Sequence, residues 1–246
     1  MNIKITVSES AEENGRRAAK KIAELIRAAI ESKGRARIVV STGSSQFEMF
    51  SALIKEDIDW TRVIMFHLDE YVGLPESHIA SFRKYLKERF VSLVPIKEAH
   101  FVNGEGDIDK NIKELTIELR KEPIDVGIIG IGENGHIAFN DPPADFTTDE
   151  AYKVVVLDTK CRMQQVGEGW FETIDDVPEK AISMMPKEIM KAEHIVTVAP
   201  HSVKAKAIYD TITHSVSPDV PATLLKTHPD WNLFIDDDSA AMLFGK

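Results

Sequence analysis

The stretch IDVGIIGIGENGH, residues 124–136, reads as a buried strand that runs directly into a glycine-rich turn. Its apolar run is short and ends in turn residues, as strands of a parallel sheet do. Ligands of open α/β sheets bind beyond the carboxyl ends of such strands, so this turn can aim His136 into a cleft. Histidine titrates near neutral pH, which suits proton transfer. Taken alone, His136 is described equally well as a loop histidine bonded to backbone.

The same stretch carries the spacing G-x-G-x-x-G at Gly130, Gly132 and Gly135. This spacing is typical of dinucleotide-binding turns. Here it lies mid-chain, and a histidine follows the last glycine directly, so the match is weak. We expect neither a cofactor nor a metal.

Strand-like and helix-like segments alternate along almost the whole chain. Apolar runs predict strands over residues 2–7, 36–43, 62–70, 124–132, 152–158 and 194–200, and at the start of 230–243. Helical spacing of apolar residues predicts helices over residues 11–32, 45–56, 79–94, 108–122 and 201–214, and at the end of 230–243. Ser8 or Ser10 should cap the first helix and Gly34 should end it. The alternation predicts an α/β fold, with a mostly parallel sheet and helices on both faces.

Length and composition narrow the class of protein. No segment of the 246 residues looks like a linker, so residues 1–246 are expected to form a single domain. The formal net charge of -10 argues against nucleic-acid binding, although one lysine or helix N-terminus can still hold a phosphate. The single cysteine, Cys161, excludes an internal disulfide framework. No segment resembles a signal peptide or a membrane span, so we expect a cytoplasmic protein without a membrane partner.

Three predicted strand ends carry chemically useful residues: STGSS (41–45), LDEY (68–71) and GIGENGHIAFND (130–141). Hydroxyls and free amides at a helix start can bind phosphate, although a tight turn with a serine cap explains STGSS as well. STGSS is not a P-loop, because that spacing is absent. Asp69 and Glu70 could merely begin a turn. The histidine and Asp141 at another strand end favour a shared cleft instead.

LDEYVGL, GENGHIAFND and STGSS together resemble the glucosamine-6-phosphate deaminase (isomerase) family. The resemblance extends from the first strand to HPDWNLF, residues 228–234. The wider superfamily includes 6-phosphogluconolactonases and the sugar-sensing domains of some repressors. The resemblance implies a Rossmann-like sheet and a cofactor-free reaction. In that reaction D-glucosamine 6-phosphate and water become D-fructose 6-phosphate and ammonia.

The resemblance also implies roles for individual residues. Asp69 would take the proton from C2 of the sugar and deliver it to C1. His136 would open the sugar ring, with Asp141 orienting it and Asn134 at a further catalytic position of the motif. The residues implied to bind the substrate's phosphate are Thr42, Gly43, Ser44, Ser45, Lys204 and Arg162.

Two positions depart from the family pattern. The family usually has glutamate where Asp141 stands, so the contact with His136 should be longer or replaced by water. Familiar bacterial members carry a phosphate-binding arginine whose position falls near Gln165 here, and Arg162 is the nearest guanidinium. Arg162 could reach the phosphate with two hydrogen bonds, or could form a surface ion pair.

Three alternatives stay open beside the glucosamine enzyme. VPATLLKTHPDW, residues 220–231, resembles galactosamine-6-phosphate isomerase as much. The string HIAFNDP (136–142) counts against a 6-phosphogluconolactonase. A sugar-phosphate sensor without turnover is disfavoured by Asp69 and His136, and by a first strand that begins near Ile3. Both a monomer and a homo-oligomer are compatible with the sequence.

Overall fold

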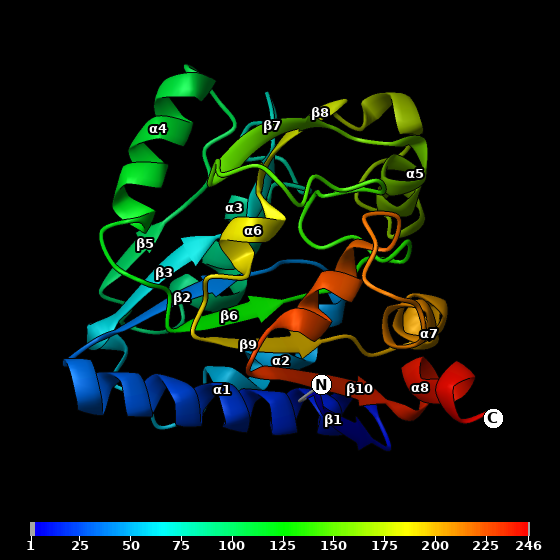
Figure 1. Cartoon of the computed structure of the whole chain (residues 1–246). Coiled ribbons are helices and arrows are strands. Elements are labelled where there is room, and N and C mark those ends of the chain that lie inside the picture. Colours follow the sequence, from blue (N-terminus) through cyan, green and yellow to red (C-terminus); the bar gives the residue numbers. More distant parts are fainter. Residues whose placement is uncertain (1–2, 246) are drawn as a thin grey trace.

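The computed structural model describes residues 3–245 of the chain. A seven-stranded sheet has the order β1-β10-β9-β6-β2-β3-β5, and every neighbouring pair in it is parallel (Figure 1). Its strands are β1 (Ile3–Ser8), β2 (Ala36–Val40), β3 (Val63–His67), β5 (Glu98–His100), β6 (Val126–Ile129), β9 (His194–Val198) and β10 (Trp231–Asp236). The predicted, mostly parallel α/β fold is therefore confirmed. The predicted first strand also included Asn2, which lies outside the described residues.

Helices cover both faces of this sheet, as the alternation predicted. The helices of residues 3–245 are α1 (Ala11–Lys33), α2 (Phe47–Leu53), α3 (Phe82–Leu86), α4 (Ile108–Leu119), α5 (Thr159–Gly167), α6 (Pro186–Ile189), α7 (Ala205–Thr213) and α8 (Asp237–Phe244), and of these α5 packs away from the main sheet. One buried apolar cluster joins α1, α2 and α3 to Ile38 and Val40 of β2. A second cluster joins α4, α6, α7 and α8 to Val39. The alternating side chains of β2 thus face opposite helical layers.

The boundaries of α1 agree with the sequence signals. The hydroxyl of Ser10 accepts a hydrogen bond from the backbone N–H of Glu13 at 3.3 Å, which caps the helix. Gly34 ends it in the left-handed conformation with φ 77°. None of the helices between residues 3 and 245 combines the length and the apolar character that crossing a bilayer requires.

A second, three-stranded antiparallel sheet stands apart from the main one, in the order β4-β8-β7. Its strands are β4 (Asp69–Tyr71), β7 (Tyr152–Val156) and β8 (Lys180–Met184). The prediction of one continuous strand over residues 62–70 is therefore wrong. The chain leaves the main sheet at Leu68, where the N–H donates to the carbonyl of Val40 at 3.3 Å and the carbonyl accepts from Met184 at 2.8 Å.

Several other elements differ from the prediction. The predicted helix over residues 79–94 consists of α3 followed by a π-helical turn, Lys87–Val91. The helices predicted over 45–56 and 201–214 begin with the 3-10 turns Ser44–Gln46 and Ser202–Lys204. β4, β5, β8, α5 and α6 were not predicted, because each is short and lacks a clear apolar period. The remaining 3-10 turns are Trp60–Arg62, Ile174–Asp176 and Pro221–Thr227.

Glu70 fixes α3 against the small sheet. Its side chain is fully buried, and Oε2 accepts hydrogen bonds from the hydroxyl of Ser81 and from the backbone N–H of Arg83, each at 2.9 Å. Oε2 also lies 3.2 Å from Nε of Arg83, whose side chain is buried as well. Oε1 accepts from the N–H of Phe82 at 3.2 Å. The carboxylate of Glu70 therefore accepts hydrogen bonds from the first backbone N–H groups of α3 and also balances the charge of a buried guanidinium.

We predict that Glu70→Gln destabilises the protein by about 3 kcal/mol, because the amide leaves the buried charge of Arg83 with a weaker partner. Urea unfolding followed by circular dichroism measures the change. Glu76→Gln is the matched control. Glu76 pairs with Lys87 at 2.6 Å in an exposed position, where such a pair contributes little. Equal unfolding midpoints for the two variants would contradict the prediction.

Candidate active site

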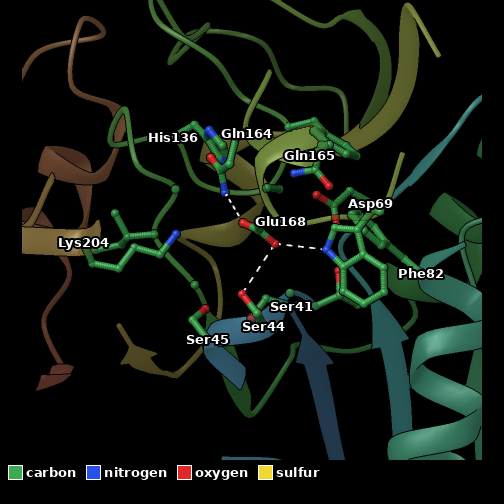
Figure 2. A pocket seen from close by; sticks show the side chains of 18 residues that line it. Ser41, Ser44, Ser45, Asp69, Phe82, His136, Gln164, Gln165, Glu168 and Lys204 are labelled. Atoms are coloured by element: carbon green, nitrogen blue, oxygen red, sulfur yellow. Dashed lines mark hydrogen bonds between the residues drawn. The ribbon is translucent and has the colours of Figure 1, made fainter. Parts of the chain in front are cut away.

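A cavity opens where four parallel strands of the main sheet end. Its walls include the loop 41–45 after β2, Asp69 after β3, the turn 130–132 after β6, and Lys204 after β9. Figure 2 shows the side chains of Asp69, His136 and Lys204 around one space. Because the carboxyl ends of the strands lie at one edge of the sheet, residues distant in sequence meet there.

The loop 41–45 presents small polar residues to the cavity. Gly43 has φ 109°, a conformation that side chains disfavour, and Ser44–Gln46 forms a 3-10 turn directly after it. The hydroxyl of Ser41 is buried and has no hydrogen-bond partner among residues 3–245. Buried polar atoms normally have a partner, so an orphaned hydroxyl in a cavity wall indicates a place for a ligand.

Lys204 is the one cationic side chain among the described residues that line this cavity. It is 5% exposed, and no carboxylate of residues 3–245 lies within ion-pairing distance of its amine. Burial lowers the pKa of Lys204, while the negative charges of Glu168 and Glu133 act in the opposite direction. An anionic ligand would supply the missing partner.

Asp69 is a buried carboxyl group that receives no hydrogen bond from residues 3–245. Burial, followed by the negative charge of neighbouring Glu70, raises the pKa of Asp69 to about 8. A carboxyl group with a pKa close to the working pH can accept and return a proton, as general acid–base catalysis requires.

His136 reaches the cavity because Gly132 makes room for its ring. A Cβ atom at position 132 would overlap Cε1, Nε2 and Nδ1 of the imidazole. The backbone N–H of Gly132 also donates to the carbonyl of His136 at 2.9 Å, which closes the turn. The absence of a side chain at Gly132 therefore allows the imidazole of His136 to occupy its position.

Asp141 and Asn134 surround the histidine, although neither lines the cavity. Nδ1 of His136 lies 3.3 Å from Oδ1 of Asp141, at ion-pairing distance, yet the geometry is not that of a hydrogen bond and Nδ1 has no hydrogen-bond partner among residues 3–245. Asn134 donates to the same Oδ1 at 3.1 Å and accepts from the N–H of His136 at 3.0 Å. Burial favours a higher pKa for Asp141, but His136 and Asn134 outweigh it and lower the pKa.

The segment around α5 contributes side chains that the sequence did not single out. Glu168 accepts hydrogen bonds from Gln164 at 2.7 Å, from the indole of Trp170 at 3.0 Å and from Ser44 at 3.5 Å (Figure 2). All four residues line the cavity. A carboxylate therefore lies beside the loop that was predicted to bind phosphate. No periodicity or motif in the sequence marked it.

Arg162 does not lie in the cavity wall. Its Nη2 donates to the backbone carbonyls of Ile174 at 2.6 Å and Val177 at 3.0 Å. It does not line the cavity and forms no ion pair with a carboxylate of residues 3–245. Gln165, at the position where the family has arginine, does line the cavity and accepts a hydrogen bond from the hydroxyl of Tyr71 at 2.8 Å. The structure thus gives no support to phosphate binding by Arg162.

Two groups of side chains within residues 3–245 have the composition and spacing of a metal site. One combines His136, Asp141 and Cys161, and the other is the more exposed group Glu98, His100 and Glu118. The expectation that the protein works without a cofactor or a metal stays a prediction.

Comparison with known proteins gives a consistent family relationship. Residues 9–233 match the family model of glucosamine-6-phosphate isomerases and 6-phosphogluconolactonases. A glucosamine-6-phosphate deaminase of Halothermothrix orenii is 38% identical over 242 residues, which cover 94% of this chain and 98% of that protein. One from Listeria welshimeri is 35% identical over 232 residues and covers 94% and 97%.

Solved structures of the same family resemble this fold. A monomeric glucosamine-6-phosphate deaminase superimposes with a TM-score of 0.88 at 27% identity, covering 97% of this chain and 99% of that one. The 6-phosphogluconolactonase of Trypanosoma brucei superimposes with a TM-score of 0.80 at 16% identity, covering 98% and 99%. At that identity the likeness concerns the fold alone.

We predict that Gly132→Ala displaces the imidazole of His136, because the added methyl group would occupy the position of the ring. A crystal structure of the variant measures the displacement. Gly167→Ala is the control, since nothing lies within 4 Å of a Cβ at that helical position, and the ring should then stay in place. An unmoved His136 in the Gly132→Ala protein would refute the proposed packing.

Proposed function

This chain belongs to the family of glucosamine-6-phosphate isomerases and 6-phosphogluconolactonases, and we propose that it is a deaminating isomerase of D-glucosamine 6-phosphate. The observation that carries the proposal is the meeting of Asp69 and His136 in one cavity. The loop 41–45 and Lys204 line the same cavity and suit a phosphate. The deaminase relatives at 35–38% identity over most of the chain support this activity.

The substrate's phosphate lies on the loop 41–45 and Lys204. Ser41, Thr42, Gly43, Ser44 and Ser45 supply hydroxyls and backbone amides. Lys204 supplies the positive charge. This places the reacting carbons toward Asp69 and His136, on the other side of the cavity (Figure 2). Holding a remote phosphate fixes the position of C1 and C2 relative to the base.

His136 opens the sugar ring. It accepts the proton of the C1 hydroxyl and donates one to the ring oxygen, and the open-chain aldehyde forms with no net change in the protonation of His136. Asp141 and Asn134 keep the imidazole oriented. Nδ1 of His136 lies 3.3 Å from Oδ1 of Asp141, without hydrogen-bond geometry.

Asp69 then moves one proton between neighbouring carbons. It takes the proton from C2 while His136 gives one to O1, so an enol forms that spans C1 and C2 and keeps the amine on C2. Return of the C2 proton to C1 gives the protonated imine of fructose 6-phosphate. Water adds to the imine carbon, ammonia leaves, and the remaining proton returns to His136. The balance is one water consumed and one ammonia released, with no oxidation or reduction.

The direct test is release of ammonia from D-glucosamine 6-phosphate by the purified protein, coupled to glutamate dehydrogenase. Parallel assays with D-galactosamine 6-phosphate and with 6-phosphogluconolactone test the epimer and the lactonase reaction. Turnover of glucosamine 6-phosphate alone supports the proposal. Turnover of the lactone alone, or binding without turnover, would overturn it.

We predict that Asp69→Asn lowers kcat by roughly 10²–10⁴-fold or more, because an amide of nearly the same shape cannot accept the C2 proton. Ammonia release measures the rate. Calorimetric binding of fructose 6-phosphate should stay near wild type, which separates lost chemistry from lost folding. Wild-type turnover in this variant would remove Asp69 from the role of base.

We predict that kcat/KM rises with pH toward an apparent pKa near 8. The base must be ionised, and burial together with Glu70 raises the pKa of Asp69 to about 8, so the active fraction grows as pH increases through that range. Binding of fructose 6-phosphate over the same range corrects for ionisation of the phosphate. A profile already flat from pH 6 would be inconsistent with this base.

We predict opposite effects from the two charged residues near the phosphate. Lys204→Ala should raise KM more than it lowers kcat, since the phosphate is remote from the reacting carbons. Glu168→Gln should lower KM, because a carboxylate hydrogen-bonded to Ser44 repels the phosphate. Steady-state kinetics measure both. A raised KM in Glu168→Gln would mean that Glu168 binds the substrate instead of opposing it.

A further inference from the structure

The proposed catalytic histidine, His136, meets two other side chains that carry different metal-binding atoms. His136, Asp141 and Cys161 each contribute one ligand atom, and these atoms all lie within 4.8 Å of one another. Cys161 is the only cysteine of the chain, and its side chain is 1% exposed. The proposed reaction uses no thiol, so the presence of sulfur here has no explanation in that chemistry.

The contact between His136 and Asp141 has the dimensions of a shared metal ion. Nδ1 lies 3.3 Å from Oδ1, is buried, and has no hydrogen-bond partner within residues 3–245. Two ligand atoms each about 2.0–2.1 Å from a tetrahedral zinc ion are themselves about 3.3 Å apart. The orphaned nitrogen and the carboxylate are therefore spaced as two ligands of one ion.

The chemical types of the three ligand atoms indicate which metal ion the site would bind. One nitrogen, one carboxylate oxygen and one sulfur form a set that suits Zn²⁺, whereas Mg²⁺ and Ca²⁺ prefer oxygen ligands alone. Three protein ligands leave a fourth position for water. We propose that His136, Asp141 and Cys161 form a Zn²⁺ site, and that zinc bound there inhibits the enzyme.

Neighbouring groups already orient the ligands. Asn134 donates to Oδ1 of Asp141 at 3.1 Å, and the backbone N–H of Asp158 donates to Oδ2 at 3.3 Å. Asp158 also caps α5 by accepting from the N–H of Cys161 at 2.6 Å, so the thiol lies in the first turn of that helix. Such outer hydrogen bonds fix ligand geometry and strengthen metal binding.

Inhibition follows from the use of Nδ1 as a ligand. The thiol of Cys161 loses its proton to solvent, the thiolate binds Zn²⁺, and no redox change occurs. With its Nδ1 lone pair on the metal, the ring of His136 no longer exchanges a proton freely at Nε2. Ring opening of the sugar then stops. Only this consequence rests on the proposed function; metal binding itself does not.

Cobalt substitution tests the site without any substrate. Co²⁺ added to the purified protein should give the near-ultraviolet charge-transfer band of a cobalt–thiolate bond, with one equivalent bound. Zn²⁺ should displace it, and competition with a chromophoric chelator measures zinc affinity. Cys161→Ser and His136→Gln should lose the band or bind zinc at least ~10-fold more weakly. His100→Gln, in the exposed group with Glu98 and Glu118, is the matched control and should change neither.

Ammonia release completes the test. Zn²⁺ should inhibit wild type and the His100→Gln control, and a chelator should restore their activity. Cys161→Ser should keep its turnover at the same zinc concentration. Absence of a cobalt–thiolate band in wild type, or unchanged zinc affinity in Cys161→Ser, overturns the proposed site. A band in a protein that releases no ammonia would support the metal site while refuting the proposed function.

Discussion

The position of Leu68 between two sheets is the constraint on which the rest of the site depends. Its N–H bonds to the carbonyl of Val40 in the parallel sheet, and its carbonyl bonds to Met184 in the antiparallel sheet. This single residue therefore separates β3, which ends at His67, from β4, which starts at Asp69. The next residue, Asp69, is therefore fixed between the two sheets, at the edge of the parallel sheet where ligands of such folds bind. Glu70, one residue further, anchors α3 through Arg83.

The cavity wall contains a positive charge, on Lys204, and a negative charge, on Glu168, that would act on a bound phosphate in opposite directions. Lys204 forms no ion pair with a carboxylate of residues 3–245, yet Glu168 lies near enough to favour its charged form. Gln165 lines the cavity, whereas Arg162 is bound to backbone carbonyls. Among residues 3–245, the part of the cavity wall proposed to bind the phosphate has Lys204 as its cation and Glu168 as its carboxylate. On that proposal, much of the affinity for a phosphate comes from the neutral donors of the loop 41–45.

Much of this arrangement could be predicted from local sequence. Apolar runs and helix caps located six of the seven strands of the main sheet and the limits of α1, because those signals are local, whereas β5 was missed. The convergence of Asp69, His136 and the loop 41–45 followed from the parallel order of the strands. The small sheet was missed, since Asp69–Tyr71 pairs with residues 181–183, more than a hundred positions away. Glu168 was missed because its partners come from α5 and from a distant loop.

The burial of Asp69 has a thermodynamic consequence. Its pKa rises from an ordinary value of 3.8 to about 8 in the folded protein, through burial and the charge of Glu70. Between these values the folded chain holds a proton on this carboxyl that the unfolded chain has released. Folding at neutral pH therefore takes up a proton from solution, and the contribution of Asp69 to stability declines as pH rises from about 4 to about 8. The same proton affinity that makes Asp69 a suitable base couples the folding of this protein to the acidity of its surroundings.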